Sequence, residues 1–154
     1  HFTDWVLQLI PEKIDWVQGF FHNGAWPQQT NEDHTQAVVR FANGAMADIV
    51  ISSMSAASRP RWRILGTKGA ILDDGTVQGG CKVMVWRDGA VATEHVKWMD
   101  SIRDEYYHNV ADHLLLGDPL IITPQDSRRV IGVIEYAERA SASGRPEAIP
   151  GEAT

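Results

Sequence analysis

The stretch from Thr35 to Asp73 constrains the fold most, because it reads as short strands joined by tight turns. Asn43-Gly44 is a strong hairpin signal, since both residues tolerate the positive φ that a two-residue turn requires. Gly66-Thr67-Lys68-Gly69 supplies a second tight connection before Ala70-Ile71-Leu72. Apolar residues recur at every second position on both sides of the first turn. This alternation predicts an antiparallel sheet with one face covered by the rest of the chain.

The second face of this sheet carries both polar and apolar side chains. They come from neighbouring strands and are Val38, Arg40, Asp48 and Val50. Such a face is neither a clean polar surface nor a core. We therefore expect it to serve as an assembly surface or as the floor of a pocket.

The remaining elements follow from hydrophobic periodicity and from helix-cap signals. The expected helices are residues 2–10, 101–116 and 123–143, and the expected outer strands are residues 13–21, 82–86 and 91–98. The residue range 22–33 reads as a polar loop. Strands grouped in the middle and helices grouped at the ends predict an α+β fold, with an open, mostly antiparallel sheet of about six strands and helices on one face. We expect one domain over residues 1–154, ending in a flexible tail at about residues 145–154.

Composition and motifs exclude several classes of protein. A net charge of −6 without a basic stripe argues against nucleic-acid binding. A single cysteine excludes a disulfide framework, and the histidines lack a ligand spacing that would predict a metal site. No apolar run reaches membrane-spanning length and no signal peptide is visible, so we expect a cytoplasmic protein without a membrane partner. No G-x-G-x-x-G occurs, so no cofactor-binding residue is predicted in this chain.

Two groups of side chains are candidates for chemistry. His1 and Asp4 share one face of the first helix, where a histidine can act as a general base. The same pair also fits a solvated helix start. Trp26 in the polar loop and the cluster Tyr106-Tyr107-His108 are pocket candidates by position, and aromatic packing is the alternative for both. These residues alone leave the function open.

Four strings in this order resemble the C-terminal domain of the glucose–fructose oxidoreductase, inositol dehydrogenase and rhizopine-catabolism family. They are His1 to Leu7, similar to a glycine-x-His-x-x-Asp helix start; Asp33 with Ala37 to Ala45; Ile64 to Ile71; and Asp126 to Pro146. Each string alone is weak, and the order and spacing carry the resemblance. The fold that it implies is the C-terminal domain seen in glyceraldehyde-3-phosphate dehydrogenase-like proteins.

The resemblance implies an oxidoreductase of two domains, of which this chain supplies the second. NAD or NADP would be bound by a preceding Rossmann domain, and the substrate would be a sugar or polyol oxidised at a hydroxyl-bearing carbon. His1 matches the family's catalytic histidine, whereas the catalytic Asp four residues earlier and the partner Lys fall outside this sequence. We expect Asp4, Trp26, Tyr107 and His108 to bind substrate, and the chain alone to be inactive.

The resemblance also implies a homodimer or homotetramer formed through the open sheet face. A non-catalytic oligomerisation or ligand-binding module is the alternative, as is a stand-alone binding protein. The residues that distinguish NAD from NADP lie in the nucleotide-binding domain. The exact substrate, the direction of the reaction and the size of the oligomer are therefore left open at this point.

Overall fold

The structure is a computed structural model that describes residues 1–57, 59–73, 75, 79–100, 102 and 104–152. Within these residues it contains three helices and seven strands. In chain order they are α1 (Phe2–Leu9), β1 (Ile14–His22), β2 (His34–Phe41), β3 (Met46–Ser52), β4 (Arg63–Gly66), β5 (Gly69–Asp73), β6 (Gly80–Arg87), β7 (Ala90–Lys97), α2 (Glu105–Leu116) and α3 (Pro124–Ser143). The predicted cap of the second helix, Ser101, lies outside the described residues.

The strands form two antiparallel sheets, ordered β1-β2-β3 and β4-β5-β6-β7. The α+β class and the antiparallel pairing are as the sequence predicted, but the strands are divided between two sheets instead of forming one open sheet. The division falls in the connection after β3, which contains Pro60, a residue that cannot donate to a strand ladder. The packing follows the same division. One compact unit holds His1–Ser55 with the chain from Tyr106 onward, and the second holds Ala56–Glu105.

The β2–β3 hairpin forms where Asn43-Gly44 predicted it, with a different turn. The Gly44 N–H donates to the Phe41 oxygen at 2.9 Å, and Gly44 alone has a positive φ, of 88°. The Asn43 side chain accepts from the Ala45 N–H at 2.9 Å. Three residues therefore form the loop, which ends in a glycine in the left-handed region. The two-residue form, with both residues at positive φ, occurs instead at Asp88-Gly89 between β6 and β7.

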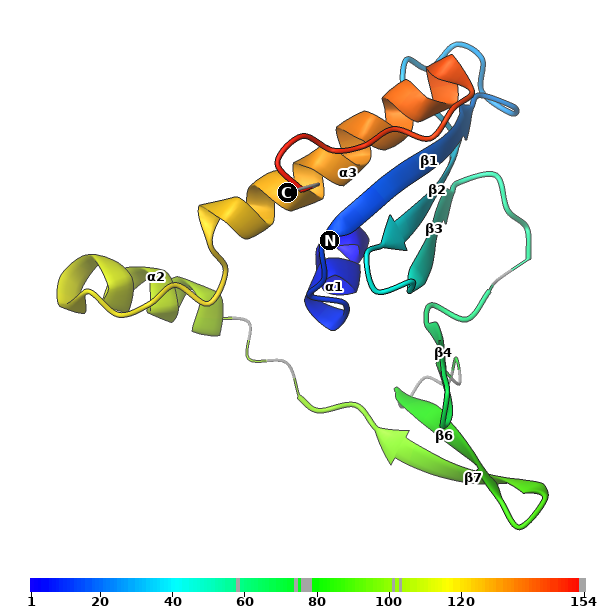
Figure 1. Ribbon diagram of the computed structural model, residues 1–154, viewed down its shortest axis with the longest axis vertical. Helices are drawn as coiled ribbons and strands as arrows, with labels where there is room; N and C mark the ends of the chain where they lie inside the picture. Colours follow the sequence, from blue (N-terminus) through cyan, green and yellow to red (C-terminus); the bar gives the residue numbers. More distant parts are fainter. Residues whose placement is uncertain (58, 74, 76–78, 101, 103, 153–154) are drawn as a thin grey trace. The chain divides into compact units, whose positions relative to one another are not determined.

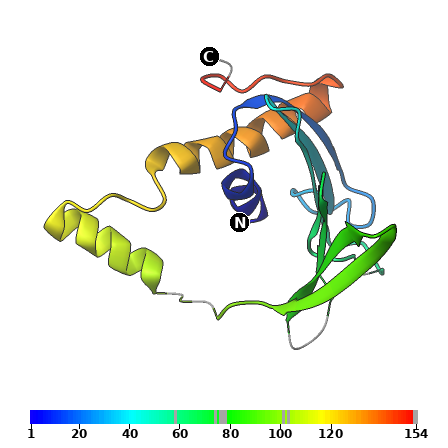
Figure 2. The same cartoon turned by 60° about the horizontal axis from the view of Figure 1, so that its bottom comes forward.

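Helices α1 and α3 pack against the same face of the three-stranded sheet (Figure 1 and Figure 2). The buried core between them is apolar and consists of Leu7, Ile14, Val17, Val39, Phe41, Val133, Ala137 and Ile149. Burial of these side chains is the main favourable term for this unit. The apolar stripes of both helices are narrower than their sequences suggest, since Trp5 on α1 and Ile131 on α3 are 40% and 60% exposed.

Gly19 on β1 lies against the backbone of α3. A Cβ atom at this position would be 1.9 Å from the Ala137 carbonyl oxygen and 2.6 Å from its carbon. These atoms belong to the helix backbone and cannot move aside as a flexible side chain would. The absence of a side chain at Gly19 therefore sets how closely α3 approaches β1.

The ends of α3 are as the sequence predicted. Thr123 caps the first turn by accepting from the Asp126 N–H at 3.2 Å, and the Asp126 carboxylate accepts from the Thr123 N–H at 2.9 Å. Pro124 occupies the first turn. Gly144 ends the helix in the left-handed region, with φ of 70°. Hydrogen bonds from Thr123, together with the charge of Arg129, lower the pKa of Asp126.

The segment after α3, predicted to be a flexible tail, is packed through residue 152. Glu147 pairs with Val17 through two backbone hydrogen bonds of 2.9 Å, which cover the free edge of β1. Ile149 enters the core, and Glu152 is 8% exposed. The Glu152 carboxylate accepts from the Arg129 guanidinium at 2.6 and 3.1 Å and from the Ile14 N–H at 3.1 Å. A composition rich in Pro, Gly and Glu concealed these contacts, because each depends on residues far away in the sequence.

The loop between β1 and β2 is organised by the carboxylate of Asp33, which is 2% exposed. Its oxygens accept from the N–H groups of Gly24 at 2.9 and 3.0 Å, Ala25 at 2.6 Å and Trp26 at 3.0 Å. Asn23 closes the arrangement by accepting from the Asp33 N–H at 3.0 Å. The hydrogen bonds from Gly24 and Ala25 lower the pKa of Asp33 below its ordinary value of 3.8, although desolvation acts in the opposite direction.

The close approach at Gly19 predicts a large cost for a single methyl group. Gly19→Ala should lower the free energy of unfolding by about 1–3 kcal/mol or more, because α3 must move away from β1. Gly66→Ala is the matched control, since its Cβ would lie 3.6 Å from the nearest atom, the Gly69 oxygen. Urea unfolding of both variants measures the difference. Equal stability of the two variants would contradict the close packing described here.

Asp33→Asn should lower the thermal unfolding temperature at pH 7, because an amide cannot replace a carboxylate that accepts from three backbone N–H groups. The pKa of Asp33 is lowered in the folded state, so its contribution to stability is complete above the unfolded value of 3.8. That contribution is lost as the pH falls through the folded value. The gap between wild type and variant should therefore narrow below pH 3.8, as followed by circular dichroism. A gap independent of pH, or one matched by the exposed Asp15→Asn, would contradict this.

Candidate functional site

His1 lies at the N-cap of α1, and its side chain makes no capping hydrogen bond. Its backbone oxygen accepts from the Trp5 N–H at 3.0 Å, which starts the helix. The side chain is exposed. The backbone of His1 therefore caps the helix, whereas its imidazole does not. An exposed imidazole can take up a proton from a neighbouring molecule.

Asp4 occupies the next turn of α1 and is half-buried. Its carboxylate accepts from the Gln8 side-chain amide at 3.0 Å, a contact between residues four apart on one helix face. Phe2 and Trp5 flank this turn with their rings edge to face, 5.3 Å apart between centroids. They are 39% and 40% exposed. The start of α1 thus presents an imidazole beside an exposed aromatic surface.

Trp26 lies in the loop held by Asp33 and is 36% exposed. Its backbone N–H is one of the donors to the Asp33 carboxylate, at 3.0 Å. The loop around it is thus an ordered turn built on backbone hydrogen bonds. The backbone of Trp26 therefore has a fixed position at the surface.

Tyr107 and His108 lie on α2, which buries no side chain and contacts no other helix or strand of the described chain. Tyr107 is 70% exposed and stacks edge to face on Tyr106 at 5.3 Å. The helix is held by the loop that follows it. The Asn109 side-chain amide donates to the Pro119 backbone oxygen at 2.9 Å and accepts from the Ile121 N–H at 2.8 Å. The structure of this chain therefore does not bring Tyr107 and His108 into contact with α1.

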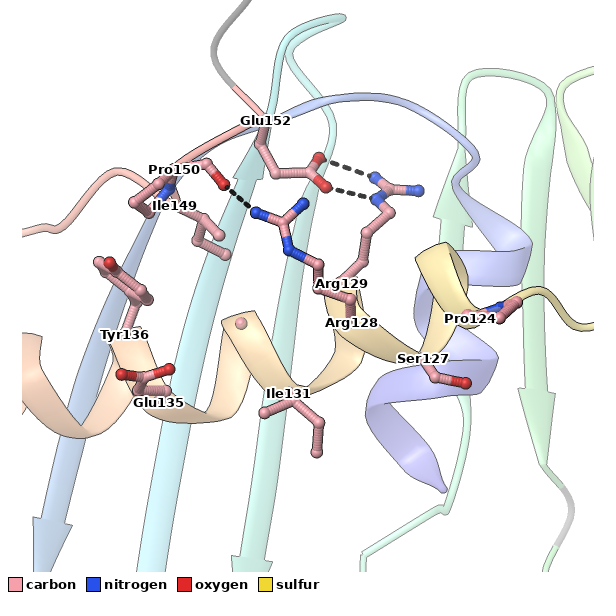
Figure 3. A pocket seen from close by; sticks show the side chains of 11 residues that line it. Pro124, Ser127, Arg128, Arg129, Ile131, Glu135, Tyr136, Ile149, Pro150 and Glu152 are labelled. Carbon is pink, nitrogen blue, oxygen red and sulfur yellow. Dashed lines mark hydrogen bonds and ion pairs between the residues drawn. The ribbon is translucent and has the colours of Figure 1, made fainter.

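A groove of about 460 Å³ runs between α3 and the segment that follows it, residues 145–152, here called the closing segment. Its polar lining includes Arg128, which donates to the Pro150 oxygen at 3.1 Å, and the Arg129–Glu152 ion pair (Figure 3). Ile131 and Ile149 supply apolar surface. None of the five predicted site residues lines this groove. Sequence analysis missed it because one of its walls is the segment that was expected to be flexible.

A glycine-rich turn between strand and helix and a cluster of metal-ligating side chains are two recognisable kinds of site. The only described strand that is followed directly by a helix is β7, and the connection Trp98–Asp104 contains no glycine. No group of three or more His, Cys, Asp and Glu side chains converges in the part of the chain that the structure describes. The described helices also include none with the length and hydrophobicity needed to cross a membrane.

Residues 1–72 match the GFO/IDH/MocA C-terminal domain family. This match begins at His1 and includes α1, the three-stranded sheet and the first hairpin of the second sheet. No curated protein matches the chain.

Solved structures extend the similarity to nearly the whole chain. The Bacillus subtilis oxidoreductase yvaA superposes with a TM-score of 0.84 at 18% identity, covering 94% of this chain and 48% of that one. An NAD-binding protein from Listeria innocua gives 0.82 at 20% identity, covering 99% and 47%. An aldose-aldose oxidoreductase from Caulobacter crescentus, complexed with glycerol, gives 0.73 at 20% identity, covering 96% and 44%.

The chain spans a little under half the length of these three structures. At this level of identity the superpositions show a shared fold. The family match over residues 1–72 agrees with them and includes the first three of the four motifs found in the sequence, while Asp126 to Pro146 lies outside it. Residues 1–72 are thus similar in sequence to the GFO/IDH/MocA C-terminal domain, and nearly the whole chain shares the fold of these oxidoreductase structures.

Proposed function

We propose that this chain is the substrate-binding and oligomerisation domain of an NAD(P)-dependent oxidoreductase that acts on a hydroxyl-bearing carbon of a sugar or polyol. The observation that carries the proposal is the position of His1, the N-cap residue of α1, which exposes its imidazole within the part of the chain that matches the family. The aldose-aldose oxidoreductase, complexed with glycerol, supports a hydroxyl-rich substrate. The nicotinamide cofactor would be bound by a part of the enzyme outside this chain.

His1 would act as the general base in this reaction. Oxidation of an alcohol carbon requires that the hydroxyl lose its proton as the carbon loses hydride, and an imidazole titrates near working pH. The Gln8 amide holds the Asp4 carboxylate at 3.0 Å, so Asp4 would present its remaining acceptor capacity to a substrate hydroxyl. Phe2 and Trp5 would supply an apolar wall beside the reacting carbon.

Trp26, Tyr107 and His108 would complete the substrate pocket once the rest of the enzyme is present. Their exposed rings suit the faces of a sugar, which stack on aromatic side chains, and the imidazole of His108 can exchange hydrogen bonds with hydroxyl groups. This part of the proposal rests on residue chemistry and on the similarity in fold to the aldose-aldose oxidoreductase. The described structure does not itself gather these residues.

The second role, assembly, is supported by the face of the three-stranded sheet that α1 and α3 leave open. The residues on this open face lie in rows across the strands: Trp16, Arg40 and Met46; Gln18, Val38 and Asp48; Phe20, Gln36 and Val50; and His22, His34 and Ser52. Phe20 and Met46 are 52% and 55% exposed in the single chain. A face that exposes large apolar side chains between polar ones is suited to a protein interface. We propose that it forms a homodimer or homotetramer.

The general-base role predicts a large effect of His1→Ala in the complete enzyme. Turnover should fall by about 10²–10⁴-fold, and the acid limb of the pH profile should be lost, because no imidazole remains to take the proton. Leu9→Ala is the matched control, since Leu9 is 57% exposed on the same helix and has no role in the proposed site. A loss below about tenfold for His1→Ala, or an equal loss for both variants, would mean that His1 only positions the helix.

The assembly role predicts that one charge on the open face dissociates the oligomer. Phe20→Asp should yield a monomer in sedimentation equilibrium at concentrations where the unmodified chain is associated, because the carboxylate would be buried without a partner. Ile131→Asp is the control, since Ile131 is 60% exposed on α3, across the sheet from the open face. A chain that is monomeric at high concentration without any substitution would contradict this role and favour a simple ligand-binding module.

A further inference from the structure

His22 and His34 lie side by side at one end of the open face. They are directly opposite each other in the antiparallel register of β1 and β2, which places both side chains on the same face. Their ring centroids are 4.9 Å apart and their planes differ by 34°. His22 is exposed and His34 is half-buried in the single chain, so the pair can be reached from solvent in the monomer. Two imidazoles held this closely can bind one metal ion together.

The Met54 thioether, a soft donor, lies near His22. The position that a Cβ atom of Gly24 would occupy is 3.4 Å from the Met54 sulfur and 3.6 Å from Cδ2 of His22, so the thioether lies within side-chain reach of the ring. Met54 is unbranched and 44% exposed, which lets its sulfur turn toward the rings. The Asp33 carboxylate also interacts electrostatically with His22, which favours a cation there.

The donor set selects among metal ions by softness and geometry. Magnesium and calcium require several oxygen ligands, which this cluster does not supply. Zinc in structural sites takes four ligands of the His, Cys, Asp and Glu type. Two imidazoles and a thioether suit copper, which also binds nitrogen ligands more strongly than the other first-row divalent ions.

We propose that His22 and His34 form a copper-binding pair on the sheet, with Met54 as a third ligand when the copper is reduced. Each imidazole binds through a neutral ring nitrogen, so one nitrogen of each ring must turn toward the ion. The proposal concerns a site distinct from His1 and does not depend on the redox function of the family. It accounts for a side-by-side imidazole pair that the core of the three-stranded sheet does not use.

The test is a titration of the chain with Cu²⁺ alone, followed by competition against a chelator and by electron paramagnetic resonance. A free terminal amine next to the His1 imidazole would itself bind copper, so all measurements use the His1→Ala background. In this background one Cu²⁺ should bind with the spectral signature of two imidazole nitrogens. Removing one of the two ligands should weaken binding by about 10²-fold, since the second contact is an intramolecular one.

His22→Ala is the first variant because His22 is exposed at the end of β1, and His34→Ala is the second. Both should bind Cu²⁺ about 10²-fold more weakly and lose one nitrogen from the spectrum, while His108→Ala on α2 should bind as the background does. Circular dichroism checks that each variant is folded. Binding within about threefold of the background in both His22→Ala and His34→Ala, or one nitrogen in the background spectrum, would overturn the proposal.

The role of Met54 is measured separately with Cu⁺ under reducing conditions. Met54→Leu keeps the size of the side chain and removes the sulfur, so it should weaken Cu⁺ binding by at least about tenfold and leave Cu²⁺ binding unchanged. A Cu⁺ affinity of Met54→Leu equal to that of the background would show that Met54 is not a ligand. The same substitution tests packing, because a loss of stability without a change in copper affinity would show that Met54 only covers the loop.

Discussion

The contact between Gly19 and the backbone of Ala137 is the constraint on which the rest of the larger unit depends. Because Gly19 has no side chain, α3 lies directly on β1, and Val133 and Ala137 reach Val17 in the core. This position also brings Arg129 to the start of β1, where it pairs with Glu152 at 2.6 Å and donates to the Glu12 oxygen at 2.6 Å. The closing segment then reaches the β1 edge and covers it. One missing methyl group thus sets how closely helix, sheet and closing segment pack.

This packing leaves some surfaces of the unit covered and others exposed. The covered face and the β1 edge are used for stability, with Glu147 and Glu152 held by hydrogen bonds. The start of α1 stays exposed, which leaves the His1 imidazole for chemistry. The opposite face of the sheet stays open, with Phe20 exposed and the His22–His34 pair at one end. The residues that stabilise the unit are therefore separated in space from those proposed for catalysis and for association, within about one hundred residues, a usual size for a domain.

Local signals predicted the parts of the fold that local physics decides. The hairpin at Asn43-Gly44 and the two ends of α3 at Thr123 and Gly144 lie where turn and cap chemistry placed them. The number of sheets could not be read in this way, since pairing between strands depends on contacts far apart in the sequence. The closing segment was misjudged for the same reason, because Glu152 is fixed by Arg129 and Ile14, and composition carries no sign of such partners.

The same distinction between local signals and long-range contacts applies to the candidate site. His1 could be proposed from a motif at the start of a helix, and its side chain is exposed in the structure. Trp26, Tyr107 and His108 could be named only by position, and α2 makes no contact with the other described helices and strands. The groove between α3 and the closing segment, like the His22–His34 pair, depends on tertiary register. No periodicity in the sequence indicates either feature.

The central claim is that the start of α1 faces the reacting carbon of a sugar or polyol in a complete NAD(P)-dependent enzyme. The most direct test is an experimental structure of that enzyme with its nicotinamide cofactor and a polyol bound. We predict that a ring nitrogen of His1 lies within hydrogen-bond distance of the hydroxyl on the carbon nearest the nicotinamide. A structure in which that imidazole faces solvent, with another side chain on the hydroxyl, would contradict it.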